Sequence, residues 1–372
     1  MKRNLFRRLG AVALSAGVFY LTVITAGTDS AAAAFSALRS AAPEGALRWE
    51  LGDLQVRDDL SGAAVLAIAQ SPQLLGARRE ILWKAEEEVP AEQEERVVIP
   101  LEETPLVPEE LADNGVAART LVPSSPEGYL VSGRTYITNS TDYALTSEEV
   151  ARSFAAGLGE GDPQILILHT HGSESYTPPE GERVVWSGDH RTTDSRYNVV
   201  SAGDAMAEVF NEAGISVLHD RTLYDYPSYN DAYDRSLEAI EAYLKEYPSI
   251  RFVLDVHRDA VEDSAGRQYK VVCETQEGTS AQMTLVVGSD GGGLFHPQWR
   301  ENLRLAAAIQ NHLLADNEQL MRPLLLRNSR YNQHATMGSL LVEVGAAGNS
   351  PGEAELAARL FARGMIEVLT ET

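Results

Sequence analysis

The sequence contains little cysteine and few basic residues for its length. One cysteine, Cys273, occurs among 372 residues, so neither a disulfide nor a cysteine-based zinc site can form within one chain. Any metal must therefore be bound by histidines and carboxylates. The 31 Lys and Arg residues are outnumbered by 54 Asp and Glu residues, for a formal net charge of −23. We exclude nucleic acid as a partner, because phosphate binding requires clustered basic residues.

One long apolar run is present, and it lies near the N-terminus. It extends from Leu9 to Gly27, carries no charge and follows four basic residues, Lys2, Arg3, Arg7 and Arg8. At helical rise this run can cross the bilayer core, and the basic cluster favours a cytoplasmic N-terminus. We therefore expect a single-pass membrane anchor over residues 1–28, with the rest of the chain extracytoplasmic. A cleaved signal peptide is the alternative, because the small residues Ala31 to Ala34 offer a cleavage site.

Residues 29–127 have the composition of a spacer. The part up to Ala85 is rich in alanine, and Glu86–Asp113 combines acidic residues, prolines and isolated aliphatic residues. Such a composition buries too little apolar surface to offset the entropy of ordering. From residue 128 to 372, short β-type runs alternate with amphipathic stretches. This alternation predicts one α/β domain with a mixed central sheet flanked by helices.

Apolar periodicity predicts the elements of this domain. The predicted strands are Gln164–His169, Ser216–Leu218, Arg251–Val256, Tyr269–Cys273, Met283–Val287, Leu324–Arg327 and Leu340–Val344. The predicted helices are Tyr197–Glu212, Tyr233–Tyr247, Trp299–Ala315 and Gly352–Leu369.

Three of the predicted strands end in residues that carry chemistry. In open α/β sheets, ligands bind at the carboxyl ends of strands, so polar residues at those ends are candidates for a site. The three segments are ILILHTHGSESY with His169, His171 and Glu174, FVLDVHRDA with Asp255, His257, Arg258 and Asp259, and SLLVEVGAAGNS with Glu343.

Two histidines and one glutamate from these segments form a candidate zinc site. Catalytic zinc needs three protein ligands and one open position, and two His with one Glu is a common set. His171 and Glu174 stand three residues apart, so a turn can direct both at one ion, and His257 completes the set. His169 is the alternative to His171, because alternate residues of an extended strand share a face. Otherwise His169 orients one of the ligands.

Glu343 and Arg258 are the predicted catalytic residues. A glutamate inside an apolar strand is costly to bury unless it faces a polar site, and zinc-dependent hydrolysis needs a general base. Arg258 can hold a substrate carboxylate or a developing oxyanion, or else pair structurally with Asp255 or Asp259. His334 lies in the loop before the Glu343 strand, where it can face the site. The histidines expected in loops or on helix surfaces, without a role, are His190, His219, His296 and His312.

The segments HTHGSESY, DVHRDA, RYNQHATMGSLLVEVGAAGN and GRTYITNSTDY resemble the stage II sporulation protein P family. The resemblance covers most of the chain. It implies a phosphorylase/hydrolase-like α/β fold similar to that of the zinc N-acetylmuramoyl-L-alanine amidases and, in outline, the zinc carboxypeptidases. Those amidases place their zinc-binding glutamate well downstream of the first histidine, whereas here Glu174 follows His171 by three residues.

The resemblance also implies a function and partners. It implies a peptidoglycan hydrolase that cleaves the amide between N-acetylmuramic acid and the L-alanine of the stem peptide, with an endopeptidase activity besides. It places this activity at the sporulation septum during engulfment, alongside stage II sporulation proteins D and M. The competing hypotheses are a zinc carboxypeptidase or endopeptidase acting on wall peptides, and a wall-binding scaffold with a decayed hydrolase fold.

Overall fold

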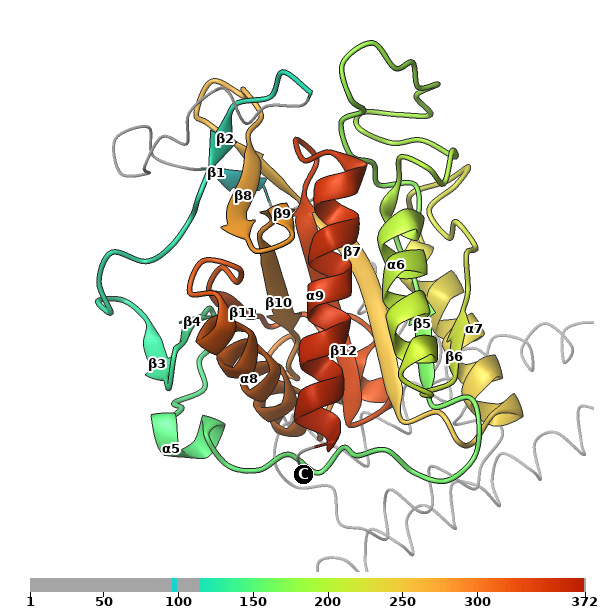
Figure 1. Ribbon diagram of the computed structural model, residues 1–372. Helices are drawn as coiled ribbons and strands as arrows, with labels where there is room; N and C mark the ends of the chain where they lie inside the picture. The colour runs from blue at the N-terminus through green and yellow to red at the C-terminus, as the bar shows by residue number, and fades with distance from the viewer. Residues whose placement is uncertain (1–95, 99–113, 371–372) are drawn as a thin grey trace, which may run out of the picture. The chain divides into compact units, whose positions relative to one another are not determined.

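The computed structural model describes residues 96–98 and 114–370. They form an α/β domain in which a mixed nine-stranded sheet is flanked by helices (Figure 1). The strand order is β3-β4-β11-β10-β12-β7-β5-β6, and β1 pairs with β7 outside this order. The predicted α/β class with a mixed central sheet is therefore confirmed.

The strands of the large sheet range from three to eleven residues. They are β1 (Arg96–Val98), β3 (Leu130–Ser132), β4 (Thr135–Asn139), β5 (Ile165–Leu168), β6 (Val217–His219), β7 (Phe252–Glu262), β10 (Met283–Val287), β11 (Leu324–Leu326) and β12 (Gly338–Ala346). A second sheet joins β2 (Ala118–Arg119), β8 (Lys270–Thr275) and β9 (Gly278–Ala281).

Helices cover both faces of the large sheet (Figure 1). Three long helices, α6 (Val199–Glu212), α8 (Trp299–Asp316) and α9 (Pro351–Thr370), lie on one face, and α7 (Ala232–Glu246) lies on the other. Two short helical segments, α5 (Ser147–Val150) and η2 (Gln333–Ala335), lie in connections. The four long helices match the predicted ones to within two residues at each end, because amphipathic periodicity is a strong signal over such lengths.

The alternation of side chains along β7 places the candidate site on one face of the sheet. Phe252, Leu254 and Val256 point into the main core beneath α6, α8 and α9. Val253 instead packs in the cluster that contains Ile240 of α7. Because successive side chains in a strand point to opposite faces, Asp255 and His257 continue the face of Val253.

Several elements differ from those predicted. β7 runs to Glu262, six residues beyond the predicted end, because its distal half is paired with β12 and β1. The polar residues Asp255 to Asp259 therefore lie within a strand rather than after one. β1 and β2 fall inside residues 29–127, and the antiparallel pair β3 and β4 was not predicted. These strands are too short to give an apolar period.

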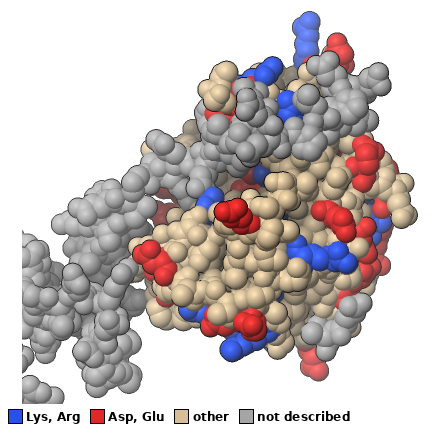
Figure 2. Space-filling model, turned by 90° about the vertical axis from the view of Figure 1, so that its left-hand side faces the viewer, with Lys and Arg blue, Asp and Glu red and all other residues tan. Residues whose placement is uncertain are grey.

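The predicted membrane anchor lies outside the described residues. Within the described part, no helix is both long and apolar enough to cross a membrane. On the face of the domain shown in Figure 2, Lys and Arg side chains are scattered among acidic and uncharged residues rather than gathered into a patch.

Gly348, in the loop after β12, provides a test of the packing next to the sheet. A methyl group added there would lie 2.6 Å from the carbonyl carbon and oxygen of Tyr269. Because backbone atoms cannot move aside cheaply, we expect Gly348→Ala to destabilise the domain by about 1–3 kcal/mol. The expected fall in the midpoint of thermal unfolding is several degrees, measured by circular dichroism. The control is Gly352→Ala in α9, where nothing lies within 4 Å; equal midpoints for the two variants would contradict the packing described.

Candidate metal centre

The candidate site lies at the carboxyl end of β5. His171 and Glu174 follow this strand, and His257 reaches them from within β7. One ligand atom from each lies within 4.8 Å of the others, and all three side chains are buried. His171 Nδ1 is 3.4 Å from Glu174 Oε1, and His257 Nδ1 is 3.4 Å from Glu174 Oε2. The structure thus brings together the three residues that the sequence predicts as metal ligands.

A short turn after β5 presents His171 and Glu174. The Glu174 amide donates to the His171 carbonyl at 3.0 Å, which closes the turn. Asp225 fixes the middle of the turn by accepting from both the amide and the hydroxyl of Ser173. Both ligands are therefore positioned by backbone geometry rather than by a flexible loop.

His257 is oriented by a buried carboxylate. Asp255 Oδ1 lies 3.0 Å from His257 Nε2, on the ring side away from Glu174. Asp255 in turn accepts hydrogen bonds from the Thr170 amide at 2.8 Å and the Thr170 hydroxyl at 2.6 Å. A carboxylate on the second ring nitrogen of a ligating histidine fixes the ring and strengthens its basicity.

The charges in this cluster favour a cation between the ligands. Burial raises the pKa of Glu174, but contacts with His171 and His257 outweigh it and hold that pKa well below the usual range. Burial lowers the pKa of His257, but Asp255 and then Glu174 outweigh it and raise that pKa well above 6.5. Glu174 is thus an anion, and the site stabilises positive charge beside it.

Glu343 stands next to His257 on the neighbouring strand. The two residues are direct partners in the parallel pairing of β12 with β7, so their side chains share a face of the sheet. Burial, followed by the charge of Asp259, raises the pKa of Glu343 well above its usual value. Its Oε2 is shielded from solvent and has no hydrogen-bond partner. A carboxyl oxygen in this state is available to a ligand or a water.

Arg258 points away from Glu343, because successive residues of β7 face opposite sides. Its guanidinium donates to the carbonyl oxygens of Ser175 at 3.2 Å and His190 at 3.0 Å. Its backbone amide donates to Glu174 Oε2 at 3.3 Å. In this structure Arg258 therefore ties the segment after Glu174 to β7.

Arg191 is a component of the site that sequence reasoning missed. Its guanidinium lies 3.6 Å from Glu174 Oε1 and forms an ion pair with Asp225. It also covers the ring of Tyr229 at 4.7 Å, and Tyr229 stacks on His171 at the same separation. Arg191 comes from an irregular loop, so no periodicity or strand end marks it in the sequence.

His169 lies outside the ligand group and is held on the α6 side of the sheet. Its Nδ1 is 2.9 Å from the Val256 carbonyl oxygen, and its Nε2 is 2.8 Å from His219 Nε2. Because a carbonyl only accepts, His169 Nδ1 carries the proton and His219 Nε2 donates to His169. His219 Nδ1 then faces Asp204 at 3.0 Å. Burial lowers the pKa of His169 to about 3 and that of His219 to about 4.

The alternation argument for His169 fails because β5 ends at Leu168. Beyond that residue the chain turns, so His169 and His171 no longer share a face. Of the other histidines, His190 and His312 lie in a loop and on a helix surface as predicted. The prediction for His219 is wrong, since His219 ends strand β6 and its ring lies against His169. His296 lies in a loop as predicted, but it is fully buried. His334 is partly buried in η2.

The donor set fits zinc. Two imidazole nitrogens and one carboxylate are the ligands that catalytic zinc commonly takes, with a further position left for water or substrate. The buried anion Glu174 lies between the two rings, and Asp255 supports the outer side of His257. A carboxylate with an unpartnered oxygen, Glu343, occupies the next strand.

The fold and this donor set define an α/β protein with a candidate metal centre at the end of its sheet. Residues 85–366 match the family described as stage II sporulation protein P, so the chain belongs to that family. No curated protein sequence matches the chain.

Solved structures of amidases share low similarity with the domain. The N-acetylmuramoyl-L-alanine amidase AmiC2 of Nostoc punctiforme is 15% identical, with a TM-score of 0.36 over 57% of this chain and 99% of that one. The amidase Ami1 of Mycobacterium smegmatis is 14% identical, with a TM-score of 0.33 over 56% and 98%. The CwlD amidase of Clostridioides difficile, solved with the GerS lipoprotein, is 15% identical, with a TM-score of 0.35 over 56% and 100%.

Removing a ligand should remove the metal. We expect His171→Ala or His257→Ala to weaken zinc affinity by more than about 100-fold, because two remaining ligands hold the ion poorly. His169→Ala should weaken it by less than about 100-fold, because His169 acts only through Val256 and its neighbours. Zinc affinity is measured by competition with a chromogenic chelator, with Glu241→Ala on the exposed face of α7 as the control. A larger loss in His169→Ala than in His171→Ala would reverse their roles.

Proposed function

We propose that this protein is a zinc-dependent hydrolase of the bacterial cell wall that cleaves the amide between N-acetylmuramic acid and L-alanine. The proposal includes action at the sporulation septum during engulfment. Membership of the stage II sporulation protein P family supports a role in sporulation. The reaction type is supported by the site itself, where metal-ligating and acid–base groups converge on one end of the sheet.

The observation that carries the proposal is the register of β12 on β7. It sets Glu343 beside His257, a member of the buried cluster with His171 and Glu174. A decayed scaffold has no need to keep an unpartnered carboxyl oxygen out of water next to three ligands, because that arrangement costs stability. Amide hydrolysis needs this combination of a Lewis acid and a proton-transferring group.

Each group has a distinct task in this reaction. His171, Glu174 and His257 hold zinc, which would act as a Lewis acid toward the scissile carbonyl. Glu343 accepts a proton from the attacking water and returns it to the leaving amine nitrogen. Burial and the charge of Asp259 raise the pKa of Glu343, which is the direction expected for a carboxyl group that returns a proton to a leaving amine.

Product analysis identifies the bond that is cleaved. Purified cell wall is incubated with the full-length protein and zinc, and the soluble products are separated and analysed by mass spectrometry. Release of intact stem peptides with a free L-alanine amino terminus is the expected result. Fragments cut only within the stem peptide would replace the amidase proposal with that of an endopeptidase or carboxypeptidase. Wall binding without any cleavage would favour the scaffold.

Glu343→Gln tests the proton-transferring role. The substitution keeps the size of the side chain but removes the basic oxygen, so turnover should fall by at least about 100-fold while zinc affinity stays near normal. Initial rates on solubilised wall and zinc content are measured on the same preparation. Near-normal turnover in zinc-loaded Glu343→Gln would remove Glu343 from the mechanism.

Arg258→Lys separates a structural role of Arg258 from a catalytic one. Loss of the contacts with the carbonyl oxygens of Ser175 and His190 should lower the thermal stability of the domain.

The proposed location is the outer face of the cytoplasmic membrane, with the N-terminal segment as a single-pass anchor. This proposal rests on the apolar run from Leu9 to Gly27 and the basic residues before it. Deleting residues 1–27 should release the protein from the membrane fraction in cells, as followed by immunoblotting. Wild-type protein recovered from the medium in a form about thirty residues shorter would support a cleaved signal peptide instead. An association with stage II sporulation proteins D and M belongs to the same proposal.

A further inference from the structure

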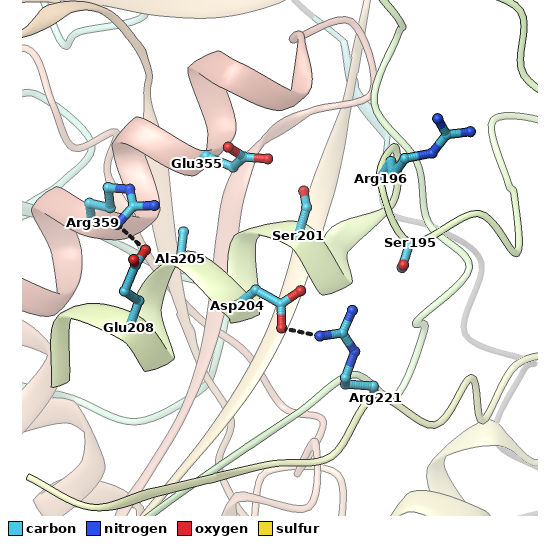
Figure 3. Close-up of a pocket in the computed structure, with 9 residues that line it drawn as sticks. All are labelled: Ser195, Arg196, Ser201, Asp204, Ala205, Glu208, Arg221, Glu355 and Arg359. Carbon is cyan, nitrogen blue, oxygen red and sulfur yellow. Dashed lines mark hydrogen bonds and ion pairs between the residues drawn. The ribbon is translucent and has the colours of Figure 1, made fainter. Parts of the chain in front are cut away.

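A pocket of about 500 Å³ lies between α6 and α9, the helices on the sheet face opposite to His257 (Figure 3). This volume suits a small ligand or one end of a peptide. No residue of the metal centre contributes to it. Its lining residues are Ser195, Arg196, Ser201, Asp204, Ala205, Glu208, Arg221, Glu355 and Arg359.

Most of the charges in the pocket are paired with each other. Asp204 pairs with Arg221, and Glu208 pairs with Arg359 at 2.6 Å, as the dashed lines in Figure 3 mark. Glu355 is the remaining acid, and no ion pair is found for it among the described residues. Its side chain is partly buried, and burial raises the pKa of its carboxyl above the usual value. Arg359 lowers the pKa of Glu355 through its charge, but Arg359 forms its ion pair with Glu208, so Glu355 is the acid of the pocket without an ion pair of its own.

Ser201 adds an unsatisfied hydroxyl beside this acid. The residue is 8% exposed, and its Oγ has no hydrogen-bond partner of good geometry. It nevertheless lies close enough to Glu355 to lower the pKa of that carboxyl. Figure 3 shows the Ser201 side chain directed from α6 into the space toward α9. A buried polar group without a partner costs about 1–3 kcal/mol, so a ligand that supplies the missing contacts is stabilised there.

The missing contacts define the chemistry of the ligand. A carboxylate only accepts hydrogen bonds, and a hydroxyl oxygen also accepts, so the ligand must donate several hydrogen bonds and carry positive charge. A primary ammonium has three donors and fits this requirement. At the rim, Arg196 pairs with Asp194 and Arg221 with Asp204, and their side chains are 74% and 53% exposed. A guanidinium has five N–H donors, so each arginine can bind a carboxylate of the same ligand beside its present partner.

We propose that the pocket binds a short peptide through a side-chain ammonium, held by Glu355 and Ser201, with a carboxylate of the peptide at the arginine rim. A wall stem peptide that contains a diamino acid has both groups, and this choice of source rests on the proposed function. The pocket and the metal centre lie on opposite faces of the sheet, so the bound stem peptide is a different one from the stem peptide being cleaved. Holding a second stem peptide raises the local concentration of wall at the metal centre.

The test is a binding measurement on the full-length protein by isothermal titration calorimetry. The probe is the tripeptide L-Ala-γ-D-Glu-L-Lys, compared with the same tripeptide acetylated on the lysine amine and with cadaverine. We expect Glu355→Gln to weaken tripeptide binding by about tenfold or more, as for loss of a charge-assisted hydrogen bond. Ser201→Ala should weaken it less. The matched control is Glu367→Gln on the exposed part of the same helix, which should leave binding unchanged.

Several outcomes would overturn the proposal. One is that the acetylated tripeptide binds as tightly as the free one. Another is that both Glu355→Gln and Ser201→Ala bind normally and have native circular dichroism spectra. A third is that binding is lost in His171→Ala but not in Glu355→Gln. Cadaverine binding as tightly as the tripeptide would overturn the peptide as the ligand. Wall digestion is measured separately. Glu355-dependent binding in a protein that cleaves no wall would defeat the proposed function alone, and wall cleavage without such binding would defeat this inference alone.

Discussion

The parallel pairing of β7 with β5 on one side and β12 on the other is the constraint on which the candidate site depends. Leu168 pairs with Asp255, so the turn that follows β5 opens directly over His257. Glu343 pairs with His257 from the other side. A shift of one residue in either register would move these side chains to the opposite face of the sheet. That shift is opposed by the apolar residues on the other face, such as Leu254 and Val342, which pack beneath three helices. The hydrophobic core therefore determines the geometry of the polar site.

The polar face of these strands is stable because nearly every buried charge has a partner. Asp255 is held by the amide and hydroxyl of Thr170, and Glu174 accepts from the amide of Arg258. Unpaired buried carboxylates are costly, and proteins satisfy almost all of them. Glu343 Oε2 is an exception on this face. The same contrast singles out the Ser201 hydroxyl on the opposite side of the sheet, where Asp204 is paired with Arg221 and Glu208 with Arg359.

Long periodic elements and the main residues of the candidate site could be predicted from the sequence, whereas irregular segments could not. The four long helices and the strand around Met283–Val287 follow from apolar periodicity, and His171, Glu174 and His257 follow from polar residues at strand ends. The end of β7 was missed because its distal half is stabilised by pairing with β1 and β12, which is a tertiary effect. Arg191 was missed because its position depends on how a loop folds back onto Glu174. Pairings such as that of His169 with His219 join residues fifty positions apart and leave no local pattern.

The segment between Glu174 and α6 connects the two sides of the sheet. The Glu174 carbonyl accepts from the amide of Val199, the first residue of α6, and the Tyr176 amide donates to the carbonyl of Tyr197. Ser201 follows two residues after Val199, so the start of α6 is bonded to the candidate ligand Glu174 and, one half-turn later, lines the pocket. A displacement of α6 would therefore act on Glu174 through the backbone rather than through a chain of side chains. Under the function proposed above, this connection would let one rigid helix start engage two stem peptides of the same wall polymer without an additional domain.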